Sequence, residues 1–433
     1  MLIGPTRWTA GLVFAGVACL VVLCLPWPAT ASEPVLRFAV ITDYGKDNPP
    51  EADVAALVKA WNPDFIVTAG DNNQGSGWGG TPEGIDPNVG QYYSDYIGNY
   101  QGAYGPGSET NRFFPAMGNH DYNTTDGYSA FTDYFTLPGN ERYYDFAFGP
   151  ARFFVLNCAS LGGYEPDGIS RTSVQAMWLH DTMGASTSPW NFVILHDSPY
   201  TSSDRHGSNP EVQWPYGPWG ADAVVSGHVH VYERLEIGGL TYLVAGVGGD
   251  SWATFGTPIP GSIVQYTGDQ GAMLVEVGTA LTRIRYYTRT GLLQDDFTLV
   301  ADGSKWLPAG SGPYHEAANW GRGQAPNAID AVANFLDDAS GTVTVDAPVA
   351  LGTINFLGAG AYTLAGPATV TLQASEGWPY GGWAQVSAVA GAHTITAPLV
   401  LAGRTRLDAQ TGALTLAGPV AMQGGAVLAV TGT

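Results

Sequence analysis

The sequence is poor in basic residues and in charge, and these shortages restrict what the protein can be. Lysine and arginine total 17 against 38 aspartates and glutamates, which gives a formal net charge of -21. A chain this acidic is not expected to bind nucleic acid, or an anionic membrane, through bulk electrostatics. Only 13% of the residues are charged and 45% are apolar. This composition excludes extended disorder and predicts two or three folded domains.

Long apolar runs are also scarce, apart from one near the N-terminus. Arg7 precedes an uninterrupted apolar run from Gly11 to Leu25, and Ala29-Thr30-Ala31 offers small residues for cleavage. The run is shorter than the roughly 20 residues of a membrane span, so a permanent anchor is the weaker alternative. We therefore predict a secretory signal peptide over residues 1–31 and a secreted protein, in the periplasm, outside the cell or on its surface.

Cysteine is nearly absent. Cleavage after residue 31 would remove Cys19 and Cys24, leaving Cys158 alone in a mature chain of 402 residues (433 minus 31). A single cysteine excludes an internal disulfide, and its place at the end of an apolar run predicts a buried thiol rather than a nucleophile. Stability must come from hydrophobic cores.

The mature sequence has two regions that differ in residue composition and pattern. Residues 32–300 alternate short apolar runs with amphipathic or Gly/Pro-rich stretches, which predicts an α/β domain. Residues 301–323, with Gly-Ser-Gly-Pro and Gly-Arg-Gly, are typical of a linker. Residues 324–433 are rich in Thr, Val, Ala, Leu and Gly, and we expect them to form a second, all-β domain.

The second domain contains an internal repeat. Thr344–Leu351 recurs as Thr394–Leu401 at an offset of 50, and Thr363–Pro367 recurs as Thr415–Pro419 at an offset of 52. Alternating strands at a fixed period favour a β-solenoid, with a β-sandwich as the alternative. The region resembles the autotransporter-like β-helical repeats of secreted bacterial proteins. Its last residues show no polar cap, so either the natural chain is longer, which would make the domain truncated here, or a partner covers the end.

In the first domain, polar residues stand where apolar runs stop. Runs of this kind end at Asp43, Asp71, His196 and His228, with His230 two residues further on. The first two runs flank a stretch with apolar residues at helical spacing, from Glu51 to Trp61, which predicts a βαβ unit. Because the carboxyl ends of parallel strands meet at one edge of a sheet, these side chains should converge there.

Each of these residues alone has an ordinary structural interpretation: an aspartate at a strand end is usually a turn or cap, and a lone histidine a core residue. Together with Asn119, they form a set of oxygen and nitrogen ligands suited to Zn, Mn or Fe. The shortage of cysteine excludes a thiolate site. The pattern therefore predicts a metal centre.

Five blocks of the sequence resemble, in order and spacing, the calcineurin-like metallophosphoesterases: Asp43-x-Gly45, Gly70-Asp71, Gly118-Asn119-His120-Asp121, His196 and Gly227-His228-x-His230. The Gly-Asp-Asn at 70–72 and the Tyr-Glu-Arg at 232–234 look most like the purple acid phosphatase branch. The resemblance implies a four-layer αββα sandwich for the first domain and two transition metal ions, Zn, Mn or Fe, divalent or of mixed valence.

Residue roles come from the resemblance alone. It implies six metal ligands: Asp43, Asp71, Asn119, His196, His228 and His230. Asp71 would bridge the two ions. A hydroxide between the ions would attack phosphorus, while His120, oriented by Asp121, would stabilise the transition state or protonate the leaving oxygen. Asn119 and His206 would contact the substrate. His206 also has an ordinary interpretation as an exposed loop residue, as does Arg205.

One position departs from the family. Purple acid phosphatases carry a tyrosine three residues after the bridging aspartate, and its phenolate binds ferric iron and gives the colour; here that residue is Gln74. A neutral amide oxygen is a weaker ligand for ferric iron than a phenolate. We therefore expect a colourless protein that favours a divalent pair.

These observations predict a secreted phosphatase that hydrolyses small phosphate monoesters. The alternatives are a phosphodiesterase of the same fold, or a degenerate domain whose solenoid serves as an adhesin or surface scaffold with a cell-surface partner. Tyrosines between the second and third blocks, and Trp78, could line a substrate groove or simply pack in the core.

Overall fold

The computed structural model describes residues 20–21, 36–74, 81, 84–122, 127–158, 165–301, 305–321, 323–375 and 382–432. The predicted signal peptide, except for Leu20 and Val21, lies outside the described residues, as does Trp78. The described residues fall into two compact units that divide near residue 303.

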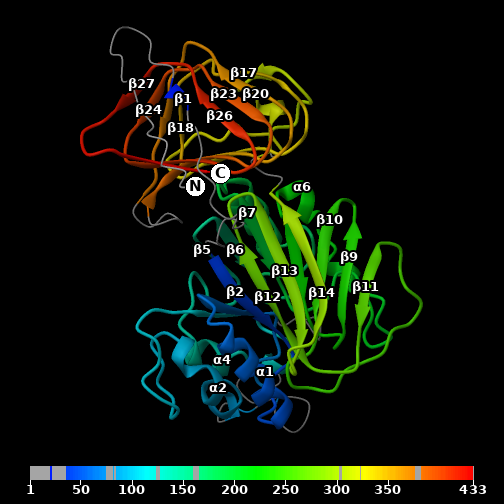
Figure 1. The fold of residues 1–433 in the computed structure, drawn as a ribbon. Coiled ribbons are helices and arrows are strands. Elements are labelled where there is room, and N and C mark those ends of the chain that lie inside the picture. Colours follow the sequence, from blue (N-terminus) through cyan, green and yellow to red (C-terminus); the bar gives the residue numbers. More distant parts are fainter. Residues whose placement is uncertain are drawn as a thin grey trace, which may run out of the picture. The chain divides into compact units, whose positions relative to one another are not determined.

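The first unit is built on two β-sheets (Figure 1). One sheet has the strand order β14-β13-β12-β2-β3-β4, and the other has the order β11-β9-β10-β8-β7-β6-β5. The strands of the first are β2 (Leu36–Ile41), β3 (Phe65–Thr68), β4 (Phe113–Pro115), β12 (Gly271–Val277), β13 (Leu281–Thr288) and β14 (Leu293–Val300). Those of the second are β5 (Tyr144–Phe148), β6 (Ala151–Val155), β7 (Trp190–Ile194), β8 (Ala223–Ser226), β9 (Tyr232–Ile237), β10 (Leu240–Ala245) and β11 (Ser262–Tyr266).

Aromatic side chains join the two sheets. The ring of Phe38 on β2 lies 5.0 Å from that of Phe153 on β6 and 5.8 Å from that of Phe192 on β7, measured between centroids. The next residue on β6, Phe154, points the other way and contacts Trp178 of α5 (Val174–Gly184). Because successive side chains of a strand face opposite sides, β6 is covered on both faces, which explains the apolar run from Phe153 to Val155.

Helix α1 (Pro49–Ala60) connects β2 to β3 and confirms the predicted βαβ unit, since β2 and β3 pair in parallel. The Asn48 side chain accepts a hydrogen bond from the Glu51 N–H and caps its first turn. The helix buries Val54 and Val58 and packs beside β12. The remaining helices are short: α2 (Gln91–Tyr93), α3 (Asn119–Tyr122), α4 (Ser129–Tyr134), α6 (Tyr216–Trp219), η2 (Asp86–Gly90), η3 (Ser94–Tyr96), η4 (Pro210–Val212) and η5 (Ala317–Asn319). No helix among the described residues has the length and apolar character to cross a bilayer.

The second unit consists of three stacked parallel sheets, to one of which β1 (Leu20–Val21) adds an antiparallel strand. The strand orders are β1-β26-β23-β20-β17-β15, β16-β19-β22-β25-β28 and β18-β21-β24-β27. The bounds are β15 (Gly312–Pro313), β16 (Val332–Phe335), β17 (Gly341–Thr344), β18 (Val349–Leu351), β19 (Thr353–Phe356), β20 (Tyr362–Ala365), β21 (Val370–Leu372), β22 (Ala384–Ala388), β23 (Ala392–Ile395), β24 (Leu399–Leu401), β25 (Arg404–Ala409), β26 (Ala413–Leu416), β27 (Val420–Met422) and β28 (Val427–Gly432). The arrangement is consistent with a β-helix-like domain and excludes the β-sandwich alternative.

The sequence repeat covers two coils rather than one. Val349 pairs with Val370, and Val370 pairs with Leu399, so the steps are 21 and 29 residues (370 minus 349, 399 minus 370). Their sum is the offset of 50 found in the sequence. A single coil escaped detection because neighbouring coils share only their inward apolar positions.

The segment expected to be a linker is part of the second unit. Among its described residues, Trp306, Tyr314 and Trp320 are buried in the same core as Phe335, and β15 pairs with β17. Two of the glycines that suggested a linker, Gly310 and Gly312, lie between Trp306 and Tyr314. The physical reason for the difference is that a stack of coils has an open first end, which these large aromatic rings cover.

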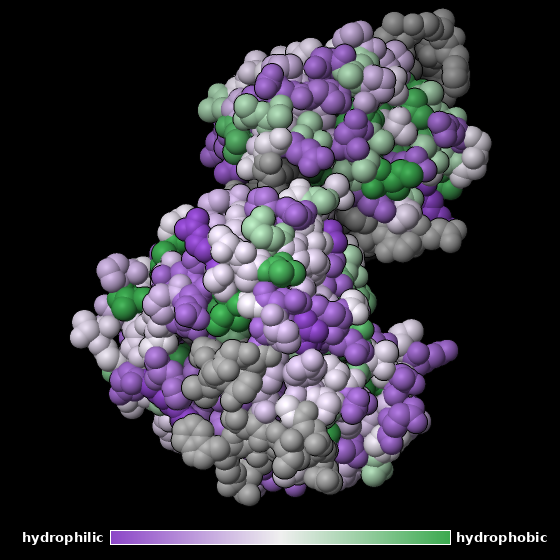
Figure 2. Space-filling view, turned by 180° about the vertical axis from the view of Figure 1, so that it is seen from behind, coloured by the Kyte–Doolittle hydropathy of each residue, from purple (hydrophilic) through white to green (hydrophobic). Residues whose placement is uncertain are grey.

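The surface shows no large apolar area on the face that Figure 2 draws, where apolar residues form small separate patches between polar ones. Cys158 is a buried free thiol, as predicted. Three of the tyrosines between the second and third sequence blocks, Tyr93, Tyr96 and Tyr100, belong to the core of the first unit, which supports the packing interpretation over a substrate groove.

Candidate metal centre

The predicted ligands lie just after strands that pair in parallel. Asp43 and Asp71 come after β2 and β3, and His196 and His228 come after β7 and β8. All of them are buried. The structure therefore brings together, at the carboxyl ends of strands from both sheets, residues that the sequence places up to 187 positions apart (230 minus 43).

Asp43 and His230 form one pair. His230 Nε2 lies 3.2 Å from Asp43 Oδ1, and the Nδ1 of the same ring lies 2.6 Å from the Ser251 carbonyl oxygen. The other Asp43 oxygen accepts hydrogen bonds from the Thr42 hydroxyl at 2.8 Å and from the His228 N–H at 2.9 Å. A carbonyl partner on Nδ1 fixes the orientation of the ring and leaves Nε2 facing the carboxylate, as in many metal sites.

Asp71, Asn119 and His196 form a second group. His196 Nε2 lies 3.3 Å from Asp71 Oδ1 and 3.1 Å from Asn119 Oδ1, while its Nδ1 lies 2.7 Å from the Ala69 carbonyl oxygen. The His196 ring is thus oriented in the same way as that of His230. Asp71 also accepts a hydrogen bond from the His120 N–H at 2.9 Å. Its carboxylate therefore lies at the centre of the group.

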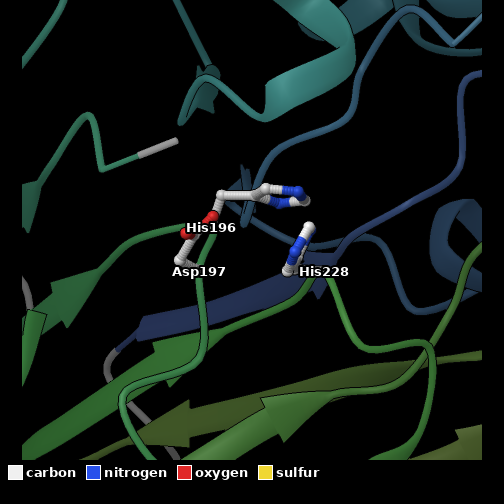
Figure 3. A group of neighbouring side chains, drawn as sticks. All are labelled: His196, Asp197 and His228. Carbon is white, nitrogen blue, oxygen red and sulfur yellow. The ribbon is translucent and has the colours of Figure 1, made fainter. Parts of the chain in front are cut away.

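His228 joins this group from the loop after β8. Its ring lies 5.0 Å from that of His196, at an interplanar angle of 68°. Figure 3 shows the two rings with Asp197, the residue after His196, beside them. Two groups have ligand atoms within 4.8 Å of one another: Asp43, Asp71 and His196, and then His196, Asp197 and His228. Either group could hold a metal ion. Asp197 was missed by the sequence analysis, which took only one residue from each strand end.

Backbone strain is concentrated in these residues. Positive φ angles occur at Asp43 (50°), Asp71 (55°), His228 (72°) and His230 (54°). This region of conformational space costs a residue with a side chain about 1–3 kcal/mol, so it persists only where the surrounding structure enforces it. Four such residues in one cluster indicate a functional site.

Two glycines allow the loops to approach this closely. A Cβ atom on Gly227 would lie 1.9 Å from the Thr42 hydroxyl oxygen and 2.8 Å from Asp43 Oδ2. A Cβ atom on Gly70, whose φ is 92°, would lie 2.5 Å from His196 Nδ1. Any side chain at these positions would push the ligands apart.

The acidic and basic groups of the site depend on one another. Burial alone would raise the pKa of Asp43, but His230, His196 and the Thr42 hydroxyl outweigh it and lower this pKa. Burial would likewise lower the pKa of His196, but Asp71 and Asp43 raise it to about 10. The buried carboxylates therefore attract positive charge, which protons on the histidines supply in the protein alone and which a bound metal ion would replace.

Unpartnered buried oxygens point to the same ligand chemistry. Asp197 Oδ1 and both amide atoms of Gln74 are buried and have no hydrogen-bond partner among the described residues, and Asp43 Oδ1 has the ion-pair contact with His230 at 3.2 Å. Leaving such atoms unpaired costs about 1–3 kcal/mol each. Oxygen atoms in this situation, next to imidazole nitrogens, fit a transition metal ion, so the residues present suit the metal pair that the family implies.

The structure gives Asp121 a different role from the one predicted. Its carboxylate accepts hydrogen bonds from the backbone N–H groups of Asn72, Asn73 and Gly118, and no bond joins it to the His120 ring among the described residues. The reason is geometric, because adjacent residues of a helix such as α3 do not face each other. Asp121 holds the loop of Asp71 against the loop of Asn119.

His120 itself lies at the edge of the site. Its Nε2 is 3.8 Å from Asp71 Oδ2, its side chain is 16% exposed, and its Nδ1 has no partner among the described residues. A partly exposed imidazole next to the central carboxylate can reach both solvent and a molecule bound at the cluster. These are the requirements for a general acid.

His206 reaches the cluster from the loop after β7. Its ring stacks on that of His228 at a centroid distance of 4.3 Å, and its backbone has a φ of 63°. Burial and the charge of Arg205 lower the pKa of His206. The residue as a whole is exposed, so it lies at the rim of the site.

Comparisons with known proteins agree with this geometry. The family model described as calcineurin-like phosphoesterase matches residues 36–232. This part of the chain is therefore a calcineurin-like metallophosphoesterase domain. Families of this kind typically bind two metal ions.

Among solved structures, the chain is distantly similar to purple acid phosphatase PPD1 from yellow lupin (Lupinus luteus) seeds, at 17% identity and a TM-score of 0.47 over 61% of this chain and 53% of that one. It thus spans about half the length of the lupin protein. It is also similar to GAP50, the anchor in the inner membrane complex of Plasmodium, at 19% identity and a TM-score of 0.46 over 61% and 89% of the two chains. A third match is PhoD, at 13% identity and a TM-score of 0.39, covering 63% and 71%.

Proposed function

We propose that the protein is a secreted hydrolase that cleaves small phosphate monoesters at a dinuclear metal centre. The observation that carries the proposal is the buried cluster in which two aspartates and three histidines converge from the ends of parallel strands. No structural role requires so many ionisable groups, since buried carboxylates and imidazoles cost stability unless they bind a ligand.

The contacts among these side chains suggest how two ions would be held. Asp43 and His230 would serve one ion and Asn119, His196 and His228 the other, with Asp71 between them. Gln74 and Asp197 each supply a further buried oxygen. When bound, the ions would neutralise phosphate oxygens and lower the pKa of a water molecule enough for it to act as the nucleophile.

The protein's own residues would then orient the ester and complete the reaction. Attack of water on phosphorus breaks the bond to the ester oxygen, which must gain a proton as it leaves. His120 is suited to donate it from Nε2, since this atom faces the cluster and the ring is partly exposed. Asp121 would act indirectly, by fixing the two loops that carry Asp71 and Asn119. His206 would contact the substrate from the rim, and Asn119 from within the site.

Two alternatives are decided by the same experiment. A phosphodiesterase would use the same cluster with a substrate of lower charge. A degenerate domain would leave the second unit, as a surface scaffold or adhesin, to carry the function. The chain keeps all six predicted ligands and lacks the family's tyrosine, whose position is Gln74. This retention favours catalysis. Secretion, and binding of a surface partner by the second unit, are parts of the proposal that rest on the sequence.

The test is hydrolysis of p-nitrophenyl phosphate and its bis-ester by the full chain, supplied separately with Zn, Mn and Fe(II). We expect metal-dependent turnover of the monoester that falls at least about 1,000-fold in Asp71→Asn and about 100-fold or more in His120→Ala. Asp181→Asn is the control, because that side chain is 74% exposed and, among the described residues, pairs with its neighbour His180 alone. Equal activity in all four proteins, or none with any metal, would overturn the proposal.

A further inference from the structure

Arg205 is a cation that has no anionic partner among the described residues, in a protein with a large excess of acid. Among the described residues between 36 and 301, seven arginines form ion pairs: Arg37, Arg142, Arg152, Arg234, Arg283, Arg285 and Arg289. Arg205 forms none with the described residues, although it is half-buried. With 38 acidic residues available against 17 basic ones, an unpaired and partly buried guanidinium needs another explanation.

Its position relates it to the metal centre. Arg205 Nε–H donates to His206 Nε2 at 3.3 Å, and the His206 ring stacks at 4.3 Å on that of His228. The hydrogen bond uses one of five N–H donors, so the rest of the planar guanidinium group can bind a ligand.

Hydrogen bonds to Glu233 hold the loop that carries Arg205. This carboxylate is fully buried and accepts hydrogen bonds from the Thr201 hydroxyl at 2.9 Å and the Ser202 N–H at 2.7 Å. The Arg205 N–H in turn donates to the Ser203 hydroxyl oxygen at 3.2 Å. A cation held in this way loses little conformational freedom on binding, which increases its affinity for a ligand.

We propose that Arg205 binds the phosphoryl oxygens of the substrate and gives the site its preference for the dianionic phosphate group of a monoester. The proposal rests on the proposed function and names the substrate class of that site. A guanidinium group presents two parallel N–H donors that match two phosphate oxygens. A monoester offers three terminal oxygens and close to two negative charges near neutral pH, whereas a diester offers two oxygens and one charge. The extra charge of the monoester is what an additional fixed cation would select.

The experiment compares Arg205→Gln and Arg205→Lys with the parent, as metal-loaded full chains. Binding of inorganic phosphate is measured by calorimetry, kcat/KM is measured for p-nitrophenyl phosphate and its bis-ester, and bound metal is determined for each protein. We expect Arg205→Gln to lose about 10- to 100-fold in phosphate affinity and in monoester kcat/KM. The bis-ester should change less than about threefold, and Arg205→Lys should recover part of the loss because it keeps the charge but not the paired donors.

Arg171→Gln serves as the matched control, because Arg171 is exposed and has no ion pair among the described residues. Unchanged phosphate affinity in Arg205→Gln, or equal losses for the monoester and the bis-ester, would overturn the proposal. The calorimetric measurement needs no turnover. If the parent binds metal and phosphate but hydrolyses neither ester, the proposed function fails while the role of Arg205 in phosphate binding is still decided.

Discussion

Parallel strands occur in both units of this chain, but the clustered side chains able to hold a metal among the described residues lie in the first unit. In the first unit, β3 and β7 end at long connections, and several of the residues just after β2, β3 and β8 have positive φ angles. In the second unit, most connections that carry the chain from one sheet to the next are short, as between Leu351 and Thr353. Both metal-competent groups among the described residues lie in the first unit.

This contrast shows that the hydrogen-bonding pattern of a sheet does not decide where chemistry can occur. The connection after each strand decides it, because the backbone conformation of the connection determines whether a polar side chain lies over the sheet edge. The contacts differ in range as well. The hydrogen bond between His228 N–H and Asp43 spans 185 residues, whereas neighbouring coils of the second unit pair residues 21 apart, such as Val349 and Val370.

Because the two units have separate hydrophobic cores, we expect them to unfold separately. Leu351→Ala tests this expectation and should have the largest effect. Leu351 is fully buried in the core of the second unit. Removing its side chain should destabilise that unit by about 2–5 kcal/mol. Calorimetry should show its unfolding transition moving down, while a second transition, that of the first unit, moves only when metal is added.

Val420→Ala is the control for Leu351→Ala, because Val420 belongs to the same unit and is 41% exposed. Its effect should stay within about 0.5 kcal/mol. If Leu351→Ala lowers both transitions together, the units are energetically coupled and the division into two independent cores is wrong.

Glu233→Gln examines the role of the long connections by loosening one of them without touching a predicted ligand. Glu233 also accepts hydrogen bonds from Ser262 and Gln265, so its carboxylate is surrounded by donors. An amide in its place must turn an NH2 group towards a donor, which should cost about 1–3 kcal/mol of stability. Because this residue holds the loop of Arg205, KM for the monoester should rise while bound metal stays constant.

Glu236→Gln, on the same strand, is the matched control, since Glu236 is exposed and accepts a bond from Thr241. It should leave both stability and KM nearly unchanged. Reduced stability of Glu233→Gln with an unchanged KM would show that the loop keeps its shape without the carboxylate.

Much of the first unit could be predicted because its signals are local. Apolar runs and the helical spacing before Trp61 predicted β2, α1 and β3, and the residues at the ends of the runs do lie together. Asp197 could not be found in this way, because its proximity to His228 depends on how two loops fold over the sheet edge. The role of Asp121 was inferred from family resemblance, which does not specify hydrogen bonds.

The second unit was harder to predict in detail for the opposite reason. Its repeat revealed stacked strands, but the single coil, whose length varies, is preserved only as a pattern of inward apolar residues such as Val343, Leu364 and Ile395. Residues 301–323 were predicted to be a linker because of their glycine content, although three of the aromatic rings in this segment, those of Trp306, Tyr314 and Trp320, are buried. Glycines in a sequence show where the chain can bend. They do not show which residues pack together once the chain has folded.

The last test concerns the residue that separates this site from the coloured phosphatases it resembles. Gln74 is fully buried, its backbone N–H donates to the Gly45 carbonyl oxygen at 2.9 Å, and its side-chain amide has no partner among the described residues. Gln74→Tyr would place a phenol where the amide lies, next to the loop that carries Asp43. We expect the ferric form of this variant to show a visible charge-transfer band that the parent lacks, with little change in hydrolysis supported by divalent ions. Gln74→Phe, which has the ring but no hydroxyl group, should remain colourless. A visible band in the parent, or its absence in an iron-loaded Gln74→Tyr, would mean that this position does not face the metal, and the buried amide would then need another partner.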